Sequence, residues 1–561
     1  MNVCLDWEGR PLLNESQVSQ SQLSQSPVAT PAAAKSLPAN SVAAVVILAA
    51  GQGTRMKSAL PKVLHAISGR TLLGHVMAAA AELEPNRTCV VVRHGRDLVA
   101  AEALRLEPAA LIVDQDEVPG TGRATQLGLA ALDAAGPING AIVVTASDVP
   151  LQDGATLAQL VAAHEADGNA VTILTTVLDD ATGYGRIVRA AADGDEASTG
   201  GVEAIVEHRD ATPEQLAINE INSGTYVFDA ALLREALASV TTVNAQGEMY
   251  LTDVVAFARA RGRQVRAVIT DDPWTVEGTN DRRQMAALGQ EMNRRIVEQW
   301  MLDGVTIIDP ATTWIDVDVE LEPDVTLLPG TQLHGATRIE SGAVIGPDTT
   351  LTDVEVKAGA TVTRTHGSLA VIEQGATVGP FSYLRPGTVL GARGKIGAFV
   401  EVKNSVIGTE SKVPHLSYVG DATIGEGSNL GAATIVANYD GVAKHRSVIG
   451  SYVRIGSDCV LVAPVDIGDG AYTAAGSVIT DDVPPGALGV GRERQHNSAG
   501  WVMRKRAGTK SAEVAAAAAH HETSSSATPE RSVSAVLTAG TATPQDVNEQ
   551  AASTEPEGTT R

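Results

Sequence analysis

The sequence has few aromatic residues and few cysteines. Aromatics make up 3% of the 561 residues, whereas glycine occurs 54 times and apolar residues reach 44%. A core of valine, isoleucine and alanine favours thin layers with tight turns over a bulky aromatic centre. The three cysteines, Cys4, Cys89 and Cys459, are odd in number and far apart. This argues against a disulfide framework and predicts a reducing, cytoplasmic compartment.

Long apolar runs and clusters of positive charge are also missing. The longest apolar candidate, residues 42–50, is typical of a buried strand and is far shorter than the roughly 18 residues that span a bilayer. The N-terminus lacks the basic start and apolar core of a secretory signal. The formal net charge is −24, and no Lys/Arg run is long enough to attract nucleic acid. We therefore expect neither a membrane nor a nucleic-acid partner.

Changes in composition divide the chain into segments. Residues 1–40 and 507–561 are polar and have no stable apolar period, which predicts disordered extensions. From 41 to 282, apolar strand-like runs alternate with helical patterns, such as AIVVTASDVPL before ATLAQLVAAHEA. This alternation predicts a Rossmann-like α/β domain, a mostly parallel sheet with helices on both faces. Residues 283–303 are charged and helical, and they predict a linker between domains.

From residue 304 to 506 the pattern becomes a repeat. Several aliphatic–Gly pairs are separated by multiples of six residues, and the pairs recur at Gly346, Gly379, Gly397, Gly425, Gly431, Gly450, Gly456 and Gly468. A six-residue period with one aliphatic residue followed by glycine predicts a parallel β-helix. Each strand then forms one face of a triangular coil, with its aliphatic side chain pointing inward. Stacked coils bury one another's faces, so we predict a left-handed β-helix domain here.

The segment LAAGQGTRMKSALPK, residues 48–62, follows the first predicted strand. Gly51 and Gly53 let the backbone approach a nucleotide closely, and successive amides can bind phosphate oxygens. Arg55 and Lys62 add positive charge where a triphosphate would lie. Dehydrogenases also have a glycine-rich turn at this point, but this turn lacks the G-x-G-x-x-G spacing. The two cations therefore favour phosphoryl chemistry.

These residues resemble a known family. L-A-A-G-x-G-T-R-M followed by P-K is similar to the sugar-1-phosphate nucleotidylyltransferases. With the motifs described next, the sequence from about 41 to 505 resembles the bifunctional N-acetylglucosamine-1-phosphate uridylyltransferase/glucosamine-1-phosphate acetyltransferase (GlmU) family. The resemblance implies a cytoplasmic enzyme that acetylates glucosamine-1-phosphate with acetyl-CoA. It then transfers a uridylyl group from UTP to the product, releasing pyrophosphate and making UDP-N-acetylglucosamine for peptidoglycan and lipid A synthesis.

For the uridylyl site, the family's motifs occur in order. Gln115 with Gly120 and Thr121 matches the uracil-reading segment, and GYGRI, VEHRDAT and EINSG match the segments that hold the acetamido sugar. Asp148 and Asn280 match the Mg²⁺ ligands, and one carboxylate with one amide oxygen suffices beside substrate phosphates and waters. On its own, Asp148 would more often be a solvated carboxylate at a strand end. The implied UTP- and sugar-binding residues are Leu48, Ala49, Ala50, Gly51, Arg55, Lys62, Gln115, Gly120, Thr121, Ala146, Ser147, Asp148, Gly185, Glu207, Asn222 and Asn280.

The resemblance also implies an acetyltransferase site on successive coils of the repeat. His415, in KVPHLSYVGD, matches the general base, and a histidine titrating near neutrality suits the removal of a proton from the sugar amine. A lone histidine in a β-helix is more often a structural hydrogen-bonding residue. The implied glucosamine-1-phosphate-binding residues are Arg385, Lys403, Tyr418 and Asn429. The implied acetyl-CoA contacts are Ala432, Asn438, Tyr439, Lys444, Ser457, Ala475 and Arg492, with Ser457 or nearby backbone as the donor to the oxyanion.

The sequence departs from the family's pattern at a few positions. Arg123 follows GTG where histidine is common, and Ala146-Ser147 precede Asp148 where an aromatic–Gly pair can occur. Ala433 replaces a common glycine, and we expect it to narrow a turn. The loop at 190–201 looks longer than needed. No motif residue is lost, although each departure could alter affinity.

The family forms trimers, with the acetyl site between neighbouring subunits, so the resemblance implies a homotrimer. Two alternatives stay open. The first is a single-activity sugar nucleotidylyltransferase with a structural or regulatory β-helix, the layout of glucose-1-phosphate adenylyl- and mannose-1-phosphate guanylyltransferases. It would have no use for the cationic and amide side chains grouped with His415. The second is a non-enzymatic sensor of nucleotide sugars, which would not need Asp148 and Asn280.

Overall fold

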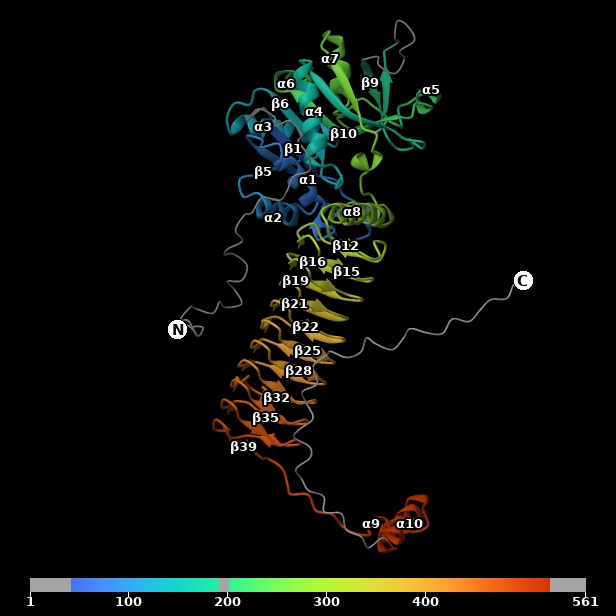
Figure 1. The fold of residues 1–561 in the computed structure, drawn as a ribbon. Coiled ribbons are helices and arrows are strands. Elements are labelled where there is room, and N and C mark those ends of the chain that lie inside the picture. Colours follow the sequence, from blue (N-terminus) through green and yellow to red (C-terminus); the bar gives the residue numbers. More distant parts are fainter. Residues whose placement is uncertain (1–41, 191–200, 525–561) are drawn as a thin grey trace, which may run out of the picture. The chain divides into compact units, whose positions relative to one another are not determined.

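The computed structural model describes residues 42–190 and 201–524, and only the backbone of 520–524 (Figure 1). The extension predicted over 1–40, most of the 190–201 loop and the end of the predicted C-terminal tail lie outside these residues. The chain divides into two compact units, Met1–Gly491 and Arg492–Arg561. Within the described residues, no helix is both long and apolar enough to cross a membrane.

The first part of the chain is an α/β domain built on a nine-stranded sheet, in the order β11-β7-β10-β6-β1-β4-β5, with β8 paired to β10 and β9 paired to β8. Strand β1 runs parallel to β4 and β6, whereas β10 is antiparallel to β6 and β7. The strands are β1 Val42–Ala49, β4 Thr88–Val92, β5 Leu111–Asp114, β6 Ala141–Ala146, β7 Val171–Val177, β8 Arg186–Arg189, β9 Val202–Val206, β10 Glu220–Asp229 and β11 Val265–Ile269, with a separate hairpin of β2 Ala66–Ile67 and β3 Arg70–Thr71. The predicted Rossmann-like class is confirmed.

Helices cover both faces of this sheet. Buried side chains of α1, α2 and α4 pack on one face, and those of α3, α6 and α7 pack on the other. The helical elements are α1 Leu72–Ala81, α2 Arg96–Leu106, α3 Thr121–Ala134, α4 Gly154–Ala166, α5 Pro213–Leu216, α6 Ala230–Leu237 and α7 Asp253–Ala260, with 3-10 turns η1 Thr54–Met56, η2 Lys62–Leu64 and η3 Pro273–Val276. The parallel strands β1, β4, β5 and β6 end at one edge, where such sheets bind ligands.

Helix α8, Arg282–Leu302, lies where we predicted the helical linker. The carboxylate of Asp281 accepts hydrogen bonds from the amides of Arg283 and Gln284, which caps its first turn. Leu288 and Met292 pack with side chains of the α/β domain, and Val297 joins the core of the following coils. The helix therefore contributes to the cores on both of its sides.

The second part is a left-handed parallel β-helix, as predicted (Figure 1). One face of its coils is an 11-stranded sheet, and the other two faces form a 17-stranded sheet. The aliphatic residue before each repeat glycine is buried, as expected for an inward side chain: Ile345, Val378, Ile396, Ile424, Leu430, Ile449, Ile455 and Ile467.

The strands of the 11-stranded face are β12 Thr306–Ile307, β15 Thr326–Leu327, β18 Val344–Ile345, β20 Thr361–Val362, β22 Thr377–Val378, β25 Lys395–Ala398, β28 Lys412–His415, β31 Asn429–Leu430, β34 Arg454–Ile455, β37 Tyr472–Thr473 and β39 Leu488–Gly489. The other strands are β13 Trp314–Ile315, β14 Glu320–Leu321, β16 Gln332–His334, β17 Arg338–Ile339, β19 Thr350–Val356, β21 Thr365–Ile372, β23 Ser382–Leu384, β24 Thr388–Leu390, β26 Glu401–Lys403, β27 Val406–Ile407, β29 Tyr418–Gly420, β30 Ala422–Ile424, β32 Ile435–Ala437, β33 Ser447–Ile449, β35 Val460–Val462, β36 Asp466–Ile467 and β38 Val478–Ile479.

The C-terminal region differs from the prediction in two ways. The last strand, β39, ends well before residue 506, and the second unit contains α9, Trp501–Lys505, and α10, Lys510–Ser524. Our prediction of disorder from 507 onward is therefore wrong for 510–524. Five consecutive alanines, residues 515–519, explain the helix, because alanine loses no side-chain entropy on helix formation.

Candidate active sites

A cavity of about 580 Å³ opens at the edge where the parallel strands of the α/β domain end. Most of the predicted nucleotide-binding residues line it, namely Leu48, Ala50, Gly51, Lys62, Gln115, Gly120, Thr121, Ala146, Ser147, Asp148, Glu207 and Asn222. Residues far apart in the sequence meet here because β1, β5 and β6 end side by side. Ala49 does not line the cavity, since it is buried within β1.

The two glycines of the turn after β1 differ in the space around them: Gly53 has no room for a side chain, and Gly51 has room. Gly53 has a φ of 62°, and a β-carbon there would lie 2.6 Å from the β-carbon of Lys62. Only glycine fits, and the stem of Lys62 packs against it. A β-carbon at Gly51 would meet no heavy atom within 4 Å. The turn therefore fixes the lysine and leaves room for a ligand beside Gly51.

The two predicted metal ligands lie on neighbouring segments, and each contacts a cation of the turn, although Asn280 and Arg55 do not line the cavity. The ammonium of Lys62 contacts the carboxylate of Asp148, and Arg55 Nη2 donates to Asn280 Oδ1 over 2.8 Å. The amide of Thr279 donates to the carbonyl of Asp148 over 3.0 Å, which joins the two segments. Among the described residues, no group of three or more His, Cys, Asp and Glu could hold a metal ion. A metal ion held by Asp148 and Asn280 would therefore need further ligands, and its binding stays a prediction.

Strand β10 and Glu207, which follows β9, form another part of the cavity wall. The amide of Asn222 donates to the carbonyl of Gly185 over 2.9 Å, so Gly185 lies next to the cavity wall. Burial raises the pKa of Glu207; a hydrogen bond from Thr252 opposes the shift, and the charge of Asp210 adds to it. Half-buried amide and carboxyl groups that can donate and accept hydrogen bonds suit the hydroxyl and acetamido groups of a sugar.

The segment predicted to read uracil is held from two sides. Gln115 Nε2 donates to the carbonyls of Val118 and Gly120, each over 3.1 Å. Arg123, the departure from the family's histidine, does not line the cavity. Its guanidinium pairs with Asp116 instead, and this bond lowers the pKa of that carboxyl. Arg123 therefore contacts the predicted uracil-reading segment through Asp116 and not from within the cavity.

Sequence reasoning missed several residues that line this cavity: Gln52, Val63, Arg93, His94, Pro119, Ala124, Gly224, Tyr226, Glu248, Leu251 and Thr252. Most of them lie on segments without a recognisable motif. The hydrogen bonds between residues 119–122 and 249–251 bring the last of these segments to the cavity.

In the β-helix, the predicted base and three of the predicted acetyl-CoA contacts lie along one edge of the coils. Ala433 N donates to the carbonyl of His415, Asp458 N to that of Ala432, and Gly476 N to that of Ser457. The column His415, Ala432, Ser457 and Ala475 thus rises through successive coils. His415, Ser457 and Ala475 are exposed, so this edge is open to a long, extended ligand.

A second group lies on the neighbouring face. Arg385 Nη1 donates to Glu401 Oε1 over 2.8 Å, and Lys403 Nζ lies 3.6 Å from Asp421 Oδ2. A β-carbon at Gly420, the last residue of β29, would clash with the Tyr418 hydroxyl and lie 2.7 Å from Asn438 Nδ2. Lys403 pairs with Gly420 across the sheet, and Arg385 interacts electrostatically with Tyr418. Arg385, Lys403, Tyr418 and Asn438 therefore form a cationic cluster suited to a phosphate.

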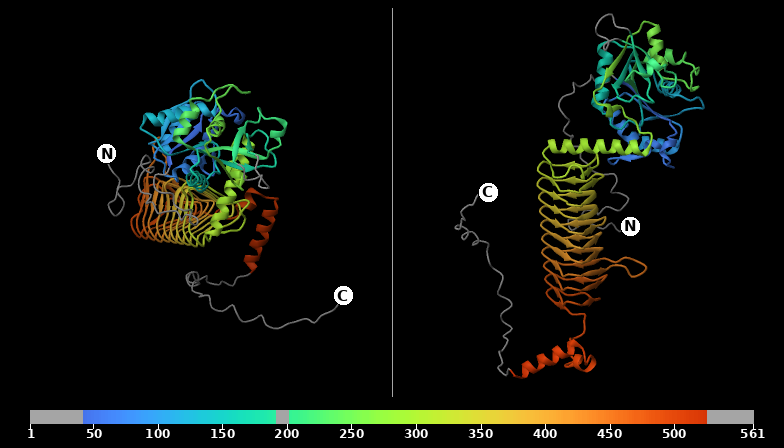
Figure 2. Two further views of the ribbon diagram at one scale, coloured as in Figure 1. Left: turned by 90° about the horizontal axis from the view of Figure 1, so that it is seen from above. Right: turned by 90° about the vertical axis from the view of Figure 1, so that its right-hand side faces the viewer.

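Asn438 begins an excursion from the coil, residues 438–446, visible as a loop in the right-hand view of Figure 2. Tyr439 and Lys444 pair across it as an antiparallel bridge, and His445 Nε2 contacts Asp440 Oδ2 at 2.7 Å. The adjacent ammonium of Lys403 lowers the pKa of Lys444. The excursion therefore adds a third cation, Lys444, to the cationic cluster.

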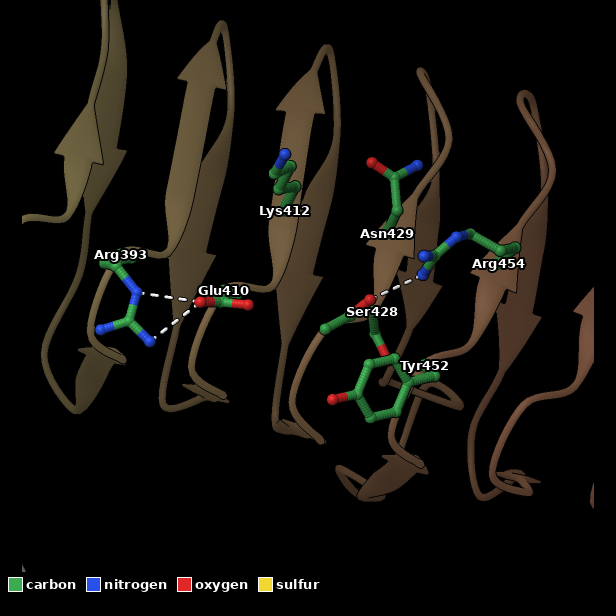
Figure 3. Close-up of a pocket in the computed structure, with 8 residues that line it drawn as sticks. Arg393, Glu410, Lys412, Ser428, Asn429, Tyr452 and Arg454 are labelled. Atoms are coloured by element: carbon green, nitrogen blue, oxygen red, sulfur yellow. Dashed lines mark hydrogen bonds and ion pairs between the residues drawn. The ribbon is translucent and has the colours of Figure 1, made fainter. Parts of the chain in front are cut away.

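Asn429 does not join this group. It lies on β31, in the 11-stranded face, between Lys412 on β28 and Arg454 on β34. Figure 3 shows these three side chains in a row beside a cavity of about 570 Å³. A single chain thus presents the predicted sugar-phosphate residues on two different faces.

Two further predicted positions need separate comment. Arg492 is the first residue of the second unit, and its role stays a prediction. Ala433 has a φ of 60°, in the left-handed region. The missing glycine therefore leaves a strained corner directly above His415. Sequence reasoning also missed Glu401 and Asp421, the two carboxylates that contact the cations, because acidic residues at a coil corner carry no motif.

The regions of the chain that match known proteins include both candidate sites. The MobA-like NTP transferase domain matches residues 45–219, and the GMPPB C-terminal domain matches residues 367–480. Proteins named bifunctional protein GlmU from Pseudarthrobacter chlorophenolicus, Paenarthrobacter aurescens and Kineococcus radiotolerans are 61%, 59% and 57% identical over 473, 473 and 491 residues. The alignments cover 84%, 84% and 88% of this chain and 95%, 94% and 98% of those proteins.

Proposed function

Because the chain belongs to the bifunctional GlmU family and is a uridylyltransferase and glucosamine-1-phosphate acetyltransferase, we propose that the α/β cavity and the β-helix edge are its two active sites. The single observation that carries this assignment is the grouping of side chains. Residues distant in sequence converge at the cavity, and His415 shares its edge with Ala432, Ser457 and Ala475. A single-activity enzyme with a structural β-helix would not need the second group.

At the cavity, the bound sugar-1-phosphate directs a phosphate oxygen at the α-phosphorus of UTP. The new O–P bond forms as the bond to pyrophosphate breaks, so the protein mainly aligns the reactants and stabilises charge. Arg55 and Lys62 exchange Asn280 and Asp148 for phosphate oxygens. Gln115 faces the base, and Glu207 and Asn222 hold the acetamido sugar.

Asp148 and Asn280 would hold Mg²⁺, because carboxylate and amide oxygens are the hard ligands that this ion prefers. When bound, Mg²⁺ would neutralise part of the charge on the phosphates. The backbone hydrogen bond from Thr279 to Asp148, which joins the two segments, supports a shared ion, and the rest of its shell would come from phosphate and water.

At the β-helix edge, the amine of glucosamine-1-phosphate attacks the thioester carbon of acetyl-CoA. His415 accepts the proton of the amine as the C–N bond forms. The C–S bond then breaks and coenzyme A leaves as a thiolate, which takes up a proton. Arg385, Lys403 and Lys444 bind phosphate groups, and Ser457 or nearby backbone donates to the oxyanion.

We also propose that the chain works as a homotrimer whose acetyl sites lie between copies. Asn429 lies on a different face from Arg385 and Lys403, so a second copy is needed to unite them. Phe381, Phe399 and Leu416 form an apolar strip next to His415, with 53%, 58% and 59% of their surfaces exposed, and the two rings stack at 5.2 Å. Two of the chain's four phenylalanines are thus exposed together, which indicates a covered surface.

A cytoplasmic location is part of the same proposal. The described cysteines, Cys89 and Cys459, are buried and free, which suits a reducing compartment. The two proposed co-substrates, UTP and acetyl-CoA, are cytoplasmic metabolites, which agrees with this location.

Thiol release from acetyl-CoA tests the function. We expect release when glucosamine-1-phosphate is added and none with N-acetylglucosamine-1-phosphate, whose nitrogen is already acylated. Pyrophosphate release should show the reverse preference with UTP and Mg²⁺. No thiol release with either sugar would reduce the β-helix to a scaffold and leave a single-activity nucleotidylyltransferase.

A charge reversal tests the assembly. In Phe381→Glu/Phe399→Glu, we expect smaller particles by analytical ultracentrifugation and loss of thiol release, with pyrophosphate release retained. A trimer of unchanged mass with full thiol release would rule out this strip as the interface.

A further inference from the structure

One buried carboxylate near the acetyl site has no role in the chemistry described above. Asp421 follows β29, has a φ of 53° and is only 7% exposed. Its Oδ1 accepts a hydrogen bond from Asn404 Nδ2 over 2.6 Å, and its Oδ2 accepts one from Asn438 Nδ2. Lys403 Nζ lies 3.6 Å from the same Oδ2. The carboxylate therefore links the coil before it to the coil after it.

Asp421 also holds both ends of the excursion at 438–446. Its side chain binds Asn438, where the excursion begins, and its carbonyl accepts the amide of Ser447 over 3.2 Å, where the excursion ends. The amide of His445 closes the base of the loop by donating to the carbonyl of Asn438 over 2.8 Å. Asp421 thus contacts both ends of the loop that carries Tyr439 and Lys444.

The charges around Asp421 explain why a carboxylate is needed there. The cationic cluster contains Arg385, Lys403 and Lys444. Glu401 contacts Arg385, and Asp421 contacts Lys403 and interacts electrostatically with Lys444. Burial raises the pKa of Asp421, but the hydrogen bonds from Asn404 and Asn438 and the charge of Lys403 outweigh burial, so its pKa lies below the ordinary value. The group is ionised at neutral pH and offsets the repulsion between Lys403 and Lys444.

We propose that Asp421 is a positioning residue for acetyl transfer: it fixes Lys403 in the sugar-phosphate subsite and the 438–446 excursion in the acetyl-CoA subsite, and so couples the two. This inference rests on the proposed function of the β-helix edge. Asp421 touches no reacting atom and acts through its three side-chain partners. Loss of its charge should weaken the binding of both substrates at once.

A purely structural role at a coil corner is the competing account, and Asp353 provides the matched control. Asp353 also has a positive φ, 54°, and its carboxylate accepts an amide hydrogen bond, from Ala336 over 2.9 Å. It is exposed, however, and it lies on β19, several coils before His415. A corner role alone would give Asp421→Asn and Asp353→Asn the same effects.

The experiment measures KM for each substrate of acetyl transfer in Asp421→Asn and Asp353→Asn, with pyrophosphate release as the test of folding. We expect Asp421→Asn to raise KM for glucosamine-1-phosphate and for acetyl-CoA about tenfold each, because a hydrogen bond to a charged group is lost on both sides. Pyrophosphate release should stay within about twofold of wild type, and Asp353→Asn should change neither KM.

A second pair of variants tests whether Asp421 acts through Lys403. In a Lys403→Met background, Asp421→Asn should add little to the KM for the sugar phosphate and still raise that for acetyl-CoA. If Asp421→Asn also loses pyrophosphate release, Asn404→Ala decides the matter. It removes a partner that belongs to neither subsite and should raise both KM values two- to threefold, roughly.

Unchanged KM values in a folded Asp421→Asn protein, or equal changes in Asp421→Asn and Asp353→Asn, would overturn the inference. Unchanged values in Asn404→Ala would do so where Asp421→Asn does not fold. Failure of the proposed function is a different result, because wild-type protein would then release no thiol at all.

Discussion

At the scale of single residues, the two glycines of the nucleotide turn differ in what they permit. Gly53 has a left-handed φ and touches Lys62, whereas Gly51 has neither restriction. Glycine is needed at residue 53 for the fold of the turn, and at residue 51 it leaves space for the ligand.

We therefore expect Gly53→Ala to destabilise the α/β domain by about 1–2 kcal/mol, the strain of an alanine at positive φ, and to displace Lys62. Gly51→Ala should leave thermal stability unchanged and raise KM for UTP about tenfold by filling space that the ligand needs. Differential scanning calorimetry and pyrophosphate release separate the two effects. Equal stability losses in both variants would contradict this reading.

Ala433 is the opposite case, a side chain where the corner favours glycine. With a φ of 60°, we expect Ala433→Gly to stabilise the protein by about 0.5–1 kcal/mol, since relief of strain exceeds the extra entropy of the unfolded chain. Urea unfolding measures the change. A loss of stability would mean that the β-carbon makes contacts worth more than the strain.

At the scale of elements, helix α4 packs on β7 through a buried histidine. His164 is 6% exposed, and its Nδ1 lies 3.1 Å from Thr172 Oγ1. Burial lowers the pKa of His164 to about 4, so the ring is neutral in the folded state near pH 6.

The lowered pKa of His164 determines in which direction stability changes with pH. The unfolded chain takes up the proton near pH 6.5 and the folded chain only near pH 4, so stability is lost as pH falls between these values. The contribution is about 3 kcal/mol at its limit. We expect His164→Gln to flatten the fall in unfolding free energy between pH 7 and pH 4, and His496→Gln, an exposed control, to leave it unchanged. The same slope in both variants would remove His164 as the cause.

At the scale of the whole molecule, the periodic patterns of the sequence predicted the two regular architectures, the α/β domain and the β-helix. The alternation of strand and helix gave the α/β class, and the aliphatic–Gly period gave the β-helix because each inward side chain meets the one in the next coil. Helix α10 has no stable apolar period, so periodicity alone does not predict it. Alanine-rich sequence is compatible with either state, and helix propensity decides between them.

The candidate sites were predictable only where motifs exist. Lys62 and Asp148 could be found in this way, but not their contact, which depends on the packing of Gly53. Asp421 and the separation of Asn429 from Lys403 depend on which face of a coil each residue occupies. The coil face that a residue occupies, and the contacts it makes there, follow from the three-dimensional winding of the coils and from the excursion at 438–446.

The central claim is that one chain carries two independent active sites, and reciprocal variants test it most directly. Thiol release and pyrophosphate release would be measured on His415→Ala and Asp148→Asn. We predict that His415→Ala lowers kcat for thiol release by about 10²–10⁴ and leaves pyrophosphate release within twofold, roughly, and that Asp148→Asn does the reverse. Loss of both activities in either variant, or full thiol release from His415→Ala, would contradict the account.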